Sequence, residues 1–223
     1  MNRDWVPRAD RLAAEALAAG DATGWFDRLY DAGRRGEVAM PWDRDDAHPL
    51  LVAWASERAP AGRGRRAVVV GCGLGADAEF VAGLGFDVVA FDVSPTAVAT
   101  VRERRPGSAV EYTVADLLDL PAAWRGAFDL VVEVHTVQAL PLDVRARATA
   151  AVRSLLAPGG TLLVVAAARD EGPPPGGPPW PLTPAEVTAF GSGLETADLQ
   201  RYADRDEPAG SRWRAEFRRP PEG

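Results

Sequence analysis

The stretch that decides the fold is Val68-Val69-Val70-Gly71-Cys72-Gly73-Leu74-Gly75-Ala76-Asp77. Its β-branched residues predict a buried strand, the glycines predict a tight turn, and the run Asp77–Ala82 predicts a helix. In a parallel α/β sheet, such a turn lies at the carboxyl end of its strand, where ligands bind. The helix behind it offers unpaired N–H groups and partial positive charge. The stretch therefore indicates a site for a nucleoside-containing cofactor.

Outward from this stretch, apolar runs alternate with helical segments. Strands are predicted at 67–70, 87–91, 110–114, 128–134 and 161–167, and helices at 76–83, 95–104 and 142–156. This alternation is typical of a parallel sheet with helices on both faces and right-handed crossovers. After a Pro- and Gly-rich run at 172–179, Thr183-Pro184-Ala185-Glu186 predicts a helix start, with an N-cap residue, a first-turn proline and a glutamate.

The two ends of the chain complete the expected architecture. Helices are predicted at 7–19, 23–33 and from Pro49, and strands at 194–202 and 211–219. We expect an α/β fold, Rossmann-like and doubly wound, with a mainly parallel seven-stranded sheet and an antiparallel C-terminal strand. Residues 1–223 are expected to form a single domain, with 1–64 as a helical N-terminal cap or lid and 65–223 as the α/β core.

The composition narrows the possible function classes. The chain has 223 residues, a formal net charge of −7 and a pI near 5.0, which argues against a large nucleic-acid footprint. Cys72 is the only cysteine, so no intramolecular disulfide can form, and its thiol is expected to be a small buried filler. Only two histidines are present, and no metal site is expected. Neither a signal peptide nor a membrane-spanning run is recognisable, so a cytoplasmic location without membrane partners is expected.

Asp92 ends the second core strand, 21 positions after Gly71. A carboxylate at this spacing can accept hydrogen bonds from ribose hydroxyls, and Val93 follows it at the same edge. The alternative is that Asp92 only caps the helix starting at Ser94-Pro95, but its agreement with the glycine turn favours the ribose role. The residues of the turn expected to bind the cofactor are Gly71, Cys72 and Gly73.

Asp116 follows the third core strand. Its carboxylate can accept a hydrogen bond from an adenine amino group while Leu117 packs on the ring, and an aspartate that only stabilises a turn is an equally good interpretation. The glycine pattern by itself also fits nicotinamide dinucleotides. However, the chain leaves no room for the separate catalytic domain that most nicotinamide dehydrogenases need.

As an ordered set, these motifs resemble those of class I S-adenosylmethionine (SAM)-dependent methyltransferases. The set consists of the glycine turn, Asp92, Asp116, Phe128-Asp129-Leu130-Val131 and Leu156-Ala157-Pro158-Gly159-Gly160, and it covers about residues 66–168. The resemblance implies SAM as cofactor, S-adenosylhomocysteine (SAH) as its product, and direct in-line methyl transfer. Many members carry an acid two residues before the first glycine, where this chain has Val69. An acidic contact near the methionine part of SAM is therefore missing or supplied elsewhere.

A narrower resemblance links the chain to the thiopurine, thiol and halide methyltransferase group. It rests on Trp25, Pro41-Trp42-Asp43, Gly71-Cys72-Gly73 with Asp77, and Gly177-Pro178-Pro179-Trp180. In that group the amino-terminal segment covers SAM, with tryptophans near the cofactor. This implies cofactor contacts for Trp25 and Trp42, and an aromatic face also suits a sulfonium.

The other tryptophans of the first quarter receive a different interpretation. Trp5 and Trp54 are expected to dock the cap on the sheet. The segment from Trp25 to Trp42 is longer than in the halide enzymes, so the acceptor of that group is not carried over to this chain.

Glu133, His135 and Gln138 follow the fourth core strand, at the edge where a methyl acceptor should lie. Glu133 is expected to reach the amino group of the cofactor or the acceptor. His135 could take a proton from an acceptor hydroxyl or thiol, because its ordinary pKa suits that role. A hydrogen-bonded structural histidine is an equally good interpretation, since a thiolate acceptor needs no dedicated base.

The sequence therefore predicts a methyltransferase that acts on a small-molecule acceptor, with a thiol or other soft nucleophile as the first choice. Small hydroxyl or amine compounds come second, and no nucleic-acid partner is expected. Two other functions remain open: an NAD(P)-dependent reductase, and a non-catalytic SAM-binding or scaffold protein. The oligomeric state is not fixed by the sequence.

Overall fold

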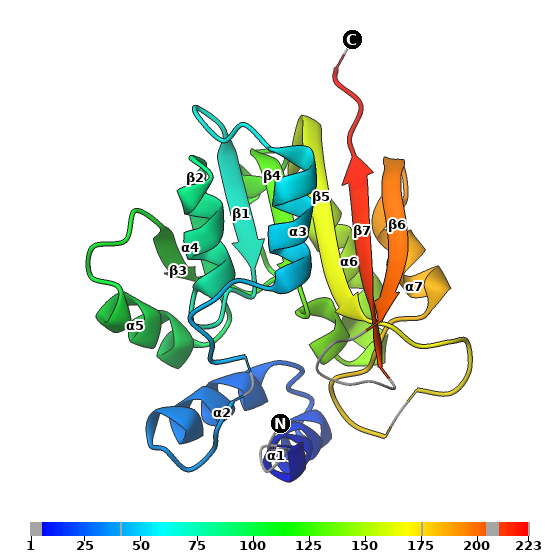
Figure 1. Ribbon diagram of the computed structural model, residues 1–223. Coiled ribbons are helices and arrows are strands. Elements are labelled where there is room, and N and C mark those ends of the chain that lie inside the picture. The colour runs from blue at the N-terminus through cyan, green and yellow to red at the C-terminus, as the bar shows by residue number, and fades with distance from the viewer. Residues whose placement is uncertain (1–5, 41, 175, 204–209, 223) are drawn as a thin grey trace.

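The computed structural model describes residues 6–40, 42–174, 176–203 and 210–222. Within them, seven strands form one sheet in the order β3-β2-β1-β4-β5-β7-β6 (Figure 1). The strands are β1 (Arg66–Val70), β2 (Asp87–Asp92), β3 (Glu111–Val114), β4 (Phe128–Val134), β5 (Leu156–Ala167), β6 (Glu195–Ala203) and β7 (Ser211–Arg218).

The strand directions agree with the sequence-based expectation. Strands β1 to β5 pair in parallel, while β7 runs antiparallel to both β5 and β6. The predicted Rossmann-like fold, with a mainly parallel seven-stranded sheet and an antiparallel C-terminal strand, is confirmed. Because β7 is antiparallel, it begins at the edge where the parallel strands end, so Ser211 and Arg212 face the same edge as the glycine turn.

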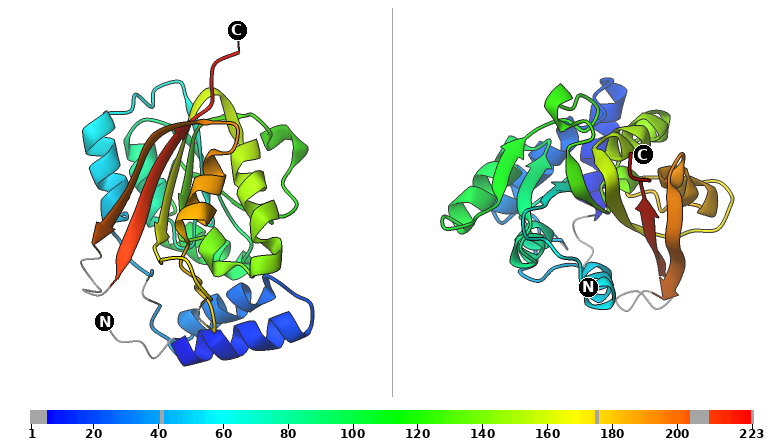
Figure 2. Two further views of the ribbon diagram at one scale, coloured as in Figure 1. Left: turned by 90° about the vertical axis from the view of Figure 1, so that its right-hand side faces the viewer. Right: turned by 90° about the horizontal axis from the view of Figure 1, so that it is seen from above.

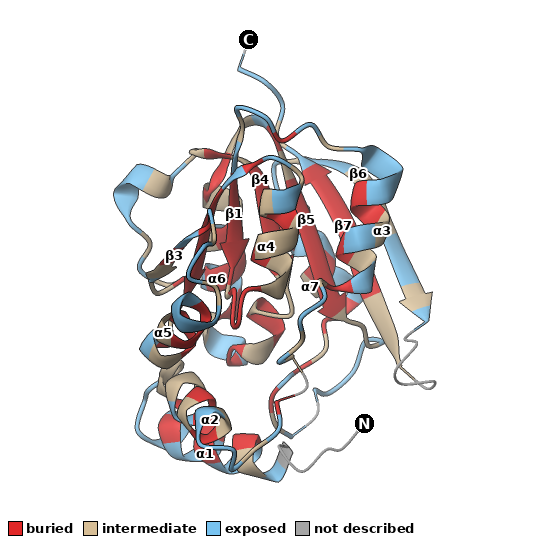
Figure 3. Cartoon of the chain, turned by 60° about the vertical axis from the view of Figure 1, so that its left-hand side comes forward, coloured by how far each residue is buried: buried red, intermediate tan, exposed pale blue. Residues whose placement is uncertain are grey.

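Helices cover both faces of the sheet, and its central strands are mostly buried, whereas the edge strand β6 is half-buried or exposed (Figure 3). The helices are α1 (Val6–Ala18), α2 (Gly24–Arg34), α3 (Pro49–Arg58), α4 (Ala76–Gly83), α5 (Pro95–Arg104), α6 (Leu142–Ser154) and α7 (Pro184–Thr188), with 3-10 turns η1 (Ala122–Trp124), η2 (Val137–Ala139) and η3 (Ala189–Gly191). Helices α3, α4 and α5 share one core cluster with Val69, whereas α6 and α7 share the other with Val68. The alternation of adjacent residues between these clusters follows from the pleat of a strand.

Helices α1 and α2, called the cap helices from here on, lie beyond the carboxyl ends of the parallel strands (Figures 1 and 2). Their apolar residues pack on each other, with Ala9 and Leu12 from α1 and Leu29 from α2 in one cluster. The same cluster includes Leu74 of the glycine turn and Ala97 of α5. The cap helices are therefore packed directly on the expected cofactor site.

Helix α3 belongs to the segment 1–64 but packs on the sheet rather than on the cap helices. Trp54 is 2% exposed, and its indole N–H donates to Glu216 of β7 at 3.1 Å. This agrees with the docking role expected for Trp54, whereas Trp5 lies outside the described residues. Among the described helices, none combines the length and the apolar character that a membrane crossing requires.

One strand begins earlier than the sequence pattern predicts. Strand β5 starts at Leu156 instead of residue 161, and α6 ends at Ser154 instead of residue 156. The pairing with β4 shifts between Phe128 and Leu130, so that the residues before Thr161 form a bulge. Proline and glycine indicate a loop in the sequence, but here they lie within an irregular strand.

Candidate active site

The turns that follow β1, β2, β3 and β4 are joined to one another at the carboxyl edge of the sheet. The N–H of Cys72 donates to the carbonyl of Phe91 at 2.9 Å, and the N–H of Ala115 donates to that of Asp92 at 3.1 Å. On the other side, the Thr136 hydroxyl donates to the Val70 carbonyl at 2.8 Å. The structure thus brings the predicted cofactor-binding segments into one continuous site.

Gly71 and Gly73 have positive φ angles, 61° and 52°, which favour glycine. A Cβ on Gly71 would lie 2.4 Å from the Thr136 hydroxyl oxygen, and one on Gly73 would lie 2.8 Å from the Tyr30 hydroxyl oxygen. The space beside both glycines is therefore occupied by other parts of the protein. These two neighbours were not anticipated from the sequence, which indicated the glycines only as part of a cofactor-binding turn.

Asp92 is 6% exposed, and both of its carboxylate oxygens accept backbone hydrogen bonds. Oδ2 accepts from Gly73 N–H and Oδ1 from Ser94 N–H, each at 2.9 Å. Burial raises the pKa of this carboxyl, although the backbone donors act against the shift. The residue that caps α5 is Ser94, whose hydroxyl accepts from Ala97 N–H at 3.0 Å. Val93, between Asp92 and Ser94, is half-buried.

Asp116 lies one residue beyond Ala115, which is itself bonded to Asp92. Its Oδ1 accepts from Leu118 N–H at 2.8 Å, so the carboxylate stabilises its own turn. Leu117 is 6% exposed and packs in the core cluster that includes Phe91. Both residues are therefore at the edge where an adenine would bind, and the turn-stabilising interpretation of Asp116 also has direct support.

Glu133 is fully buried at the end of β4. Its Oε1 accepts from Thr136 N–H at 2.7 Å and Val137 N–H at 2.9 Å, while the buried Oε2 has no hydrogen-bond partner among the described residues. Burial raises the pKa of this carboxyl to about 7. Because Glu133 pairs with Val70 across the sheet, its turn lies beside the first glycine.

His135 follows β4 with a left-handed φ of 61°, which costs a non-glycine residue about 1–3 kcal/mol. Its Nε2 lies 3.3 Å from Nε2 of His48 and 3.3 Å from Nη1 of Arg212. His48 accepts from Leu50 N–H with Nδ1, so neutral His48 carries its proton on Nε2 and donates to His135. Burial, followed by the nearby His135 and arginines, lowers the pKa of His48 to about 2 and keeps it neutral.

The two tryptophans assigned to the cofactor lie in different environments. Trp25 is 4% exposed and stacks on Phe26, with ring centroids 4.0 Å apart, inside the apolar cluster formed by the cap helices. Trp42 is half-buried and meets Tyr30 edge to face, with centroids 6.4 Å apart. A Cβ on Gly73 would be 4.0 Å from Trp42, so Trp42 is the tryptophan next to the glycine turn.

The segment 170–182, described at all positions except 175, lies beside the turn that follows β4. Trp180 N–H donates to the Gln138 carbonyl at 2.8 Å, and Gln138 Oε1 accepts from Ala167 N–H at 2.6 Å. A Cβ on Gly177 would lie 2.7 Å from a carboxylate oxygen of Asp10 in α1. This segment therefore links the β4 turn to the cap helices.

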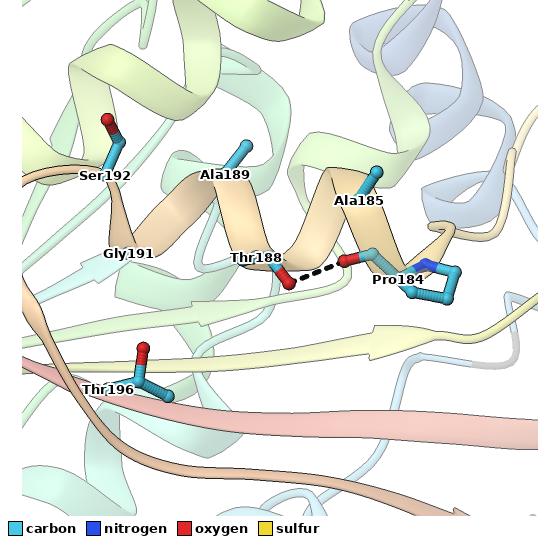
Figure 4. A pocket seen from close by; sticks show the side chains of 7 residues that line it. All are labelled: Pro184, Ala185, Thr188, Ala189, Gly191, Ser192 and Thr196. Atoms are coloured by element: carbon cyan, nitrogen blue, oxygen red, sulfur yellow. Dashed lines mark hydrogen bonds between the residues drawn. The ribbon is translucent and has the colours of Figure 1, made fainter.

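Several residues at this edge were not singled out by the sequence: Asp27, Tyr30, His48, Thr136 and Arg212. For Asp27 and Tyr30, a signal was available, because residues three apart on a helix share a face. The others depend on contacts between distant segments. By contrast, the surface hollow in Figure 4, lined by Pro184, Ala185, Thr188, Ala189, Gly191, Ser192 and Thr196, includes no predicted site residue.

The sequence model of the thiopurine S-methyltransferase family matches residues 24–218, which is most of the chain. The chain belongs to the thiopurine S-methyltransferase family. The class predicted from the sequence, a SAM-dependent methyltransferase, is thereby confirmed at the level of the family.

The chain also resembles individual proteins, both in sequence and in structure. The ubiquinone biosynthesis O-methyltransferase of Thiobacillus denitrificans is 35% identical over 117 residues, 52% of this chain and 49% of that protein. The chain thus spans about half the length of the curated relatives it matches. A structure from work on the conversion of a disulfide bond into a thioacetal group during echinomycin biosynthesis aligns with a TM-score of 0.69 and 25% identity, over 89% of this chain and 94% of that one.

A second solved structure carries the same fold. The 1,6-didemethyltoxoflavin-N1-methyltransferase of Burkholderia thailandensis, with bound 1,6-didemethyltoxoflavin and SAH, aligns with a TM-score of 0.67 and 19% identity, over 95% of this chain and 91% of that one. At this identity the likeness concerns the fold. It agrees with the observed sheet order.

Proposed function

We propose that this member of the thiopurine S-methyltransferase family transfers the methyl group of SAM to a small-molecule acceptor with a soft nucleophile, a thiol being the first choice. The observation that carries the proposal is the joined edge of four strands, where the glycine turn, Asp92 and Glu133 lie together. SAM would supply an electrophilic methyl group on a sulfonium. The protein would contribute mainly by holding acceptor and methyl carbon close and aligned.

The residues present fit this cofactor. Asp92 is held by two backbone donors, and its remaining lone pairs can accept from ribose hydroxyls. Glu133 Oε2 is a buried acceptor without a partner among the described residues, which suits the ammonium group of the methionine part. An acid on β4 would thus take the part of the acid that is missing at Val69. Asp116 and Leu117 would contact the adenine, and Trp42 would cover the turn.

The contacts of His135 support an acceptor that needs no base. Its Nε2 faces the Nε2 of His48 and the guanidinium of Arg212, so the atom that would take a proton already faces two donors. A thiol can ionise near neutral pH before it reaches the site, whereas a hydroxyl cannot. This arrangement favours a thiolate over an alcohol, and the base role of His135 stays a prediction from sequence.

The proposal is tested by calorimetry with SAM and SAH, followed by a screen of thiol, amine and hydroxyl acceptors for release of SAH. We expect binding of both nucleosides and the fastest release with thiols. The proposal would be refuted if the protein bound neither SAM nor SAH. Binding without product from any acceptor would favour the non-catalytic alternative, and binding of NADPH in a fluorescence titration would favour the reductase.

Glu133 predicts a pH dependence of stability. Its pKa is about 7 in the folded protein, above the ordinary 4.5, so its contribution to the free energy of unfolding is fully present below pH 4.5 and is lost as the pH rises to 7. The loss is about 3 kcal/mol, since one pKa unit corresponds to about 1.4 kcal/mol. Relative to Glu133→Gln, the wild-type protein should therefore become less stable between pH 5 and pH 8 in urea denaturation.

The same denaturation experiment in the presence of SAH tests the proposed contact between Glu133 and the ammonium group of the ligand. Saturating SAH should stabilise the wild-type protein more at pH 7.5 than at pH 5, because only ionised Glu133 attracts the ammonium group. The Glu133→Gln protein should lack this difference. Equal stabilisation by SAH at both pH values in the wild-type protein would contradict the assigned contact.

A further inference from the structure

Helix α2 places one carboxylate against the loop that carries Asp92. Oδ1 of Asp27 accepts from the Ser94 hydroxyl at 2.6 Å and from Thr96 N–H at 2.9 Å. These two donors belong to the start of α5, where a negative charge is favourable because of the helix dipole. Asp27 therefore docks the cap helices on the first turn of α5.

Ser94 connects this docking contact to Asp92. Its hydroxyl donates to Asp27 while its N–H donates to Oδ1 of Asp92, and the residue is completely buried. The other oxygen of Asp92 accepts from Gly73 in the glycine turn. A continuous line of hydrogen bonds thus runs from the cap helices through Ser94 and Asp92 to the turn.

The charge on Asp27 is maintained in this position. Burial alone would raise the pKa of its carboxyl, but the hydrogen bonds from Ser94 and Thr96 outweigh burial and hold the pKa below its ordinary value. Two described ion pairs also join residues of the segment 1–64 to α5, but both are exposed. Arg34–Glu103 joins side chains that are 50% and 61% exposed, and Arg104–Asp43 joins side chains that are 49% and 37% exposed. Exposed pairs of this kind contribute little.

We infer that Asp27 is a positioning residue, which couples docking of the cap helices to the orientation of Asp92 and thereby to cofactor binding. The inference rests on the proposed function. With Asp27 in place, Ser94 is held from two sides and presents its N–H to Asp92. Without it, Ser94 and Thr96 lose their hydrogen bonds to the cap helices, and of the described contacts only the apolar packing of α5 on the cap helices and exposed ion pairs remain. Because coupling is reciprocal, the cofactor must also strengthen cap docking.

The experiment measures SAH affinity by calorimetry in the wild-type protein, Asp27→Ala, Asp27→Asn and Arg34→Ala. Asp27→Ala should weaken SAH binding about tenfold, within the usual range of coupling between sites. Asp27→Asn keeps an oxygen that accepts from Ser94, so it should weaken binding less. Arg34→Ala breaks an exposed cap contact that does not touch the loop, and its affinity should equal that of the wild-type protein.

A second readout separates positioning from general stability. SAH should slow hydrogen exchange in residues 6–40 of the wild-type protein, and saturating SAH should leave this segment unprotected in Asp27→Ala. Unchanged SAH affinity in Asp27→Ala would overturn the inference, as would an equal loss in Arg34→Ala. If the alanine variant does not fold, the Asp27→Asn variant decides the question. Wild-type SAH affinity and wild-type protection of residues 6–40 in this variant would indicate that Asp27 only caps α5, and would overturn the inference. A wild-type protein that does not bind SAH would refute the proposed function itself.

Discussion

Asp92→Ala is expected to weaken SAH binding by at least about a hundredfold and to destabilise the protein as well. The change removes the acceptor proposed for the ribose hydroxyls, and hydrogen bonds to a charged group are each worth about 1.5–3 kcal/mol. It also leaves the N–H groups of Gly73 and Ser94 without their partner in a buried site. Each such group costs about 1–3 kcal/mol, so the free energy of unfolding should fall by about 2–6 kcal/mol.

The matched control is Asp87→Ala at the other end of the same strand, where the side chain is exposed. In this variant, calorimetry should find an unchanged SAH affinity, and urea denaturation should find an unchanged free energy of unfolding. Asp92→Asn keeps one carbonyl oxygen for the backbone donors, so it should lose less stability than the alanine variant. Wild-type affinity in a folded Asp92→Ala protein would exclude the ribose role.

Arg145→Ala is expected to lower the free energy of unfolding by about 3 kcal/mol, because it removes the buried donor of several acceptors, and each buried group left without its partner costs about 1–3 kcal/mol. Arg145 is 4% exposed, and its Nη1 lies 2.6 Å from Oε1 of Glu186, whose side chain is 27% exposed. Its Nη2 donates to the carbonyls of Gln138 and Leu140 at 3.4 Å and of Trp180 at 3.3 Å. Without it, these groups would be buried with one partner fewer.

The control for this prediction is Arg153→Ala on the same helix, since Arg153 makes one exposed contact to the Ala189 carbonyl. Urea denaturation should find less than about 0.5 kcal/mol of change there, as is usual for surface positions. Because Arg145 holds both Gln138 and Trp180, its loss should also increase hydrogen exchange in residues 170–182. A loss of stability below about 1 kcal/mol in Arg145→Ala would contradict the assigned role of this ion pair.

The sheet and most of its helices were predictable because local sequence determines them. The span Phe128–Val134 agrees with the predicted strand, and Pro95–Arg104 agrees with the predicted helix after its Ser94 cap. Apolar periodicity, prolines at helix starts and glycines at turns act within a few residues. The early start of β5 escaped prediction because a bulge depends on pairing with β4, which is far away in the sequence.

For the site, the sequence predicted which edge of the sheet matters but not how its side chains pair. Asp92 and Glu133 were found from their place at strand ends, and both lie at the joined edge. The link from Asp27 to Ser94 joins residues 67 positions apart, and His135 meets Arg212 across 77 positions. Such pairs depend on tertiary packing, on which a single sequence carries no local signal.

The cap helices touch both sides of the site, through Asp27 at the loop after β2 and through Asp10 beside Gly177 of the segment 170–182. Because α1 and α2 pack on each other, a movement that breaks one of these contacts is expected to disturb the other as well. Arrival of the methyl donor and departure of the spent nucleoside would therefore share one gate. The frequency with which this gate opens then sets an upper limit on turnover, however fast the transfer step is.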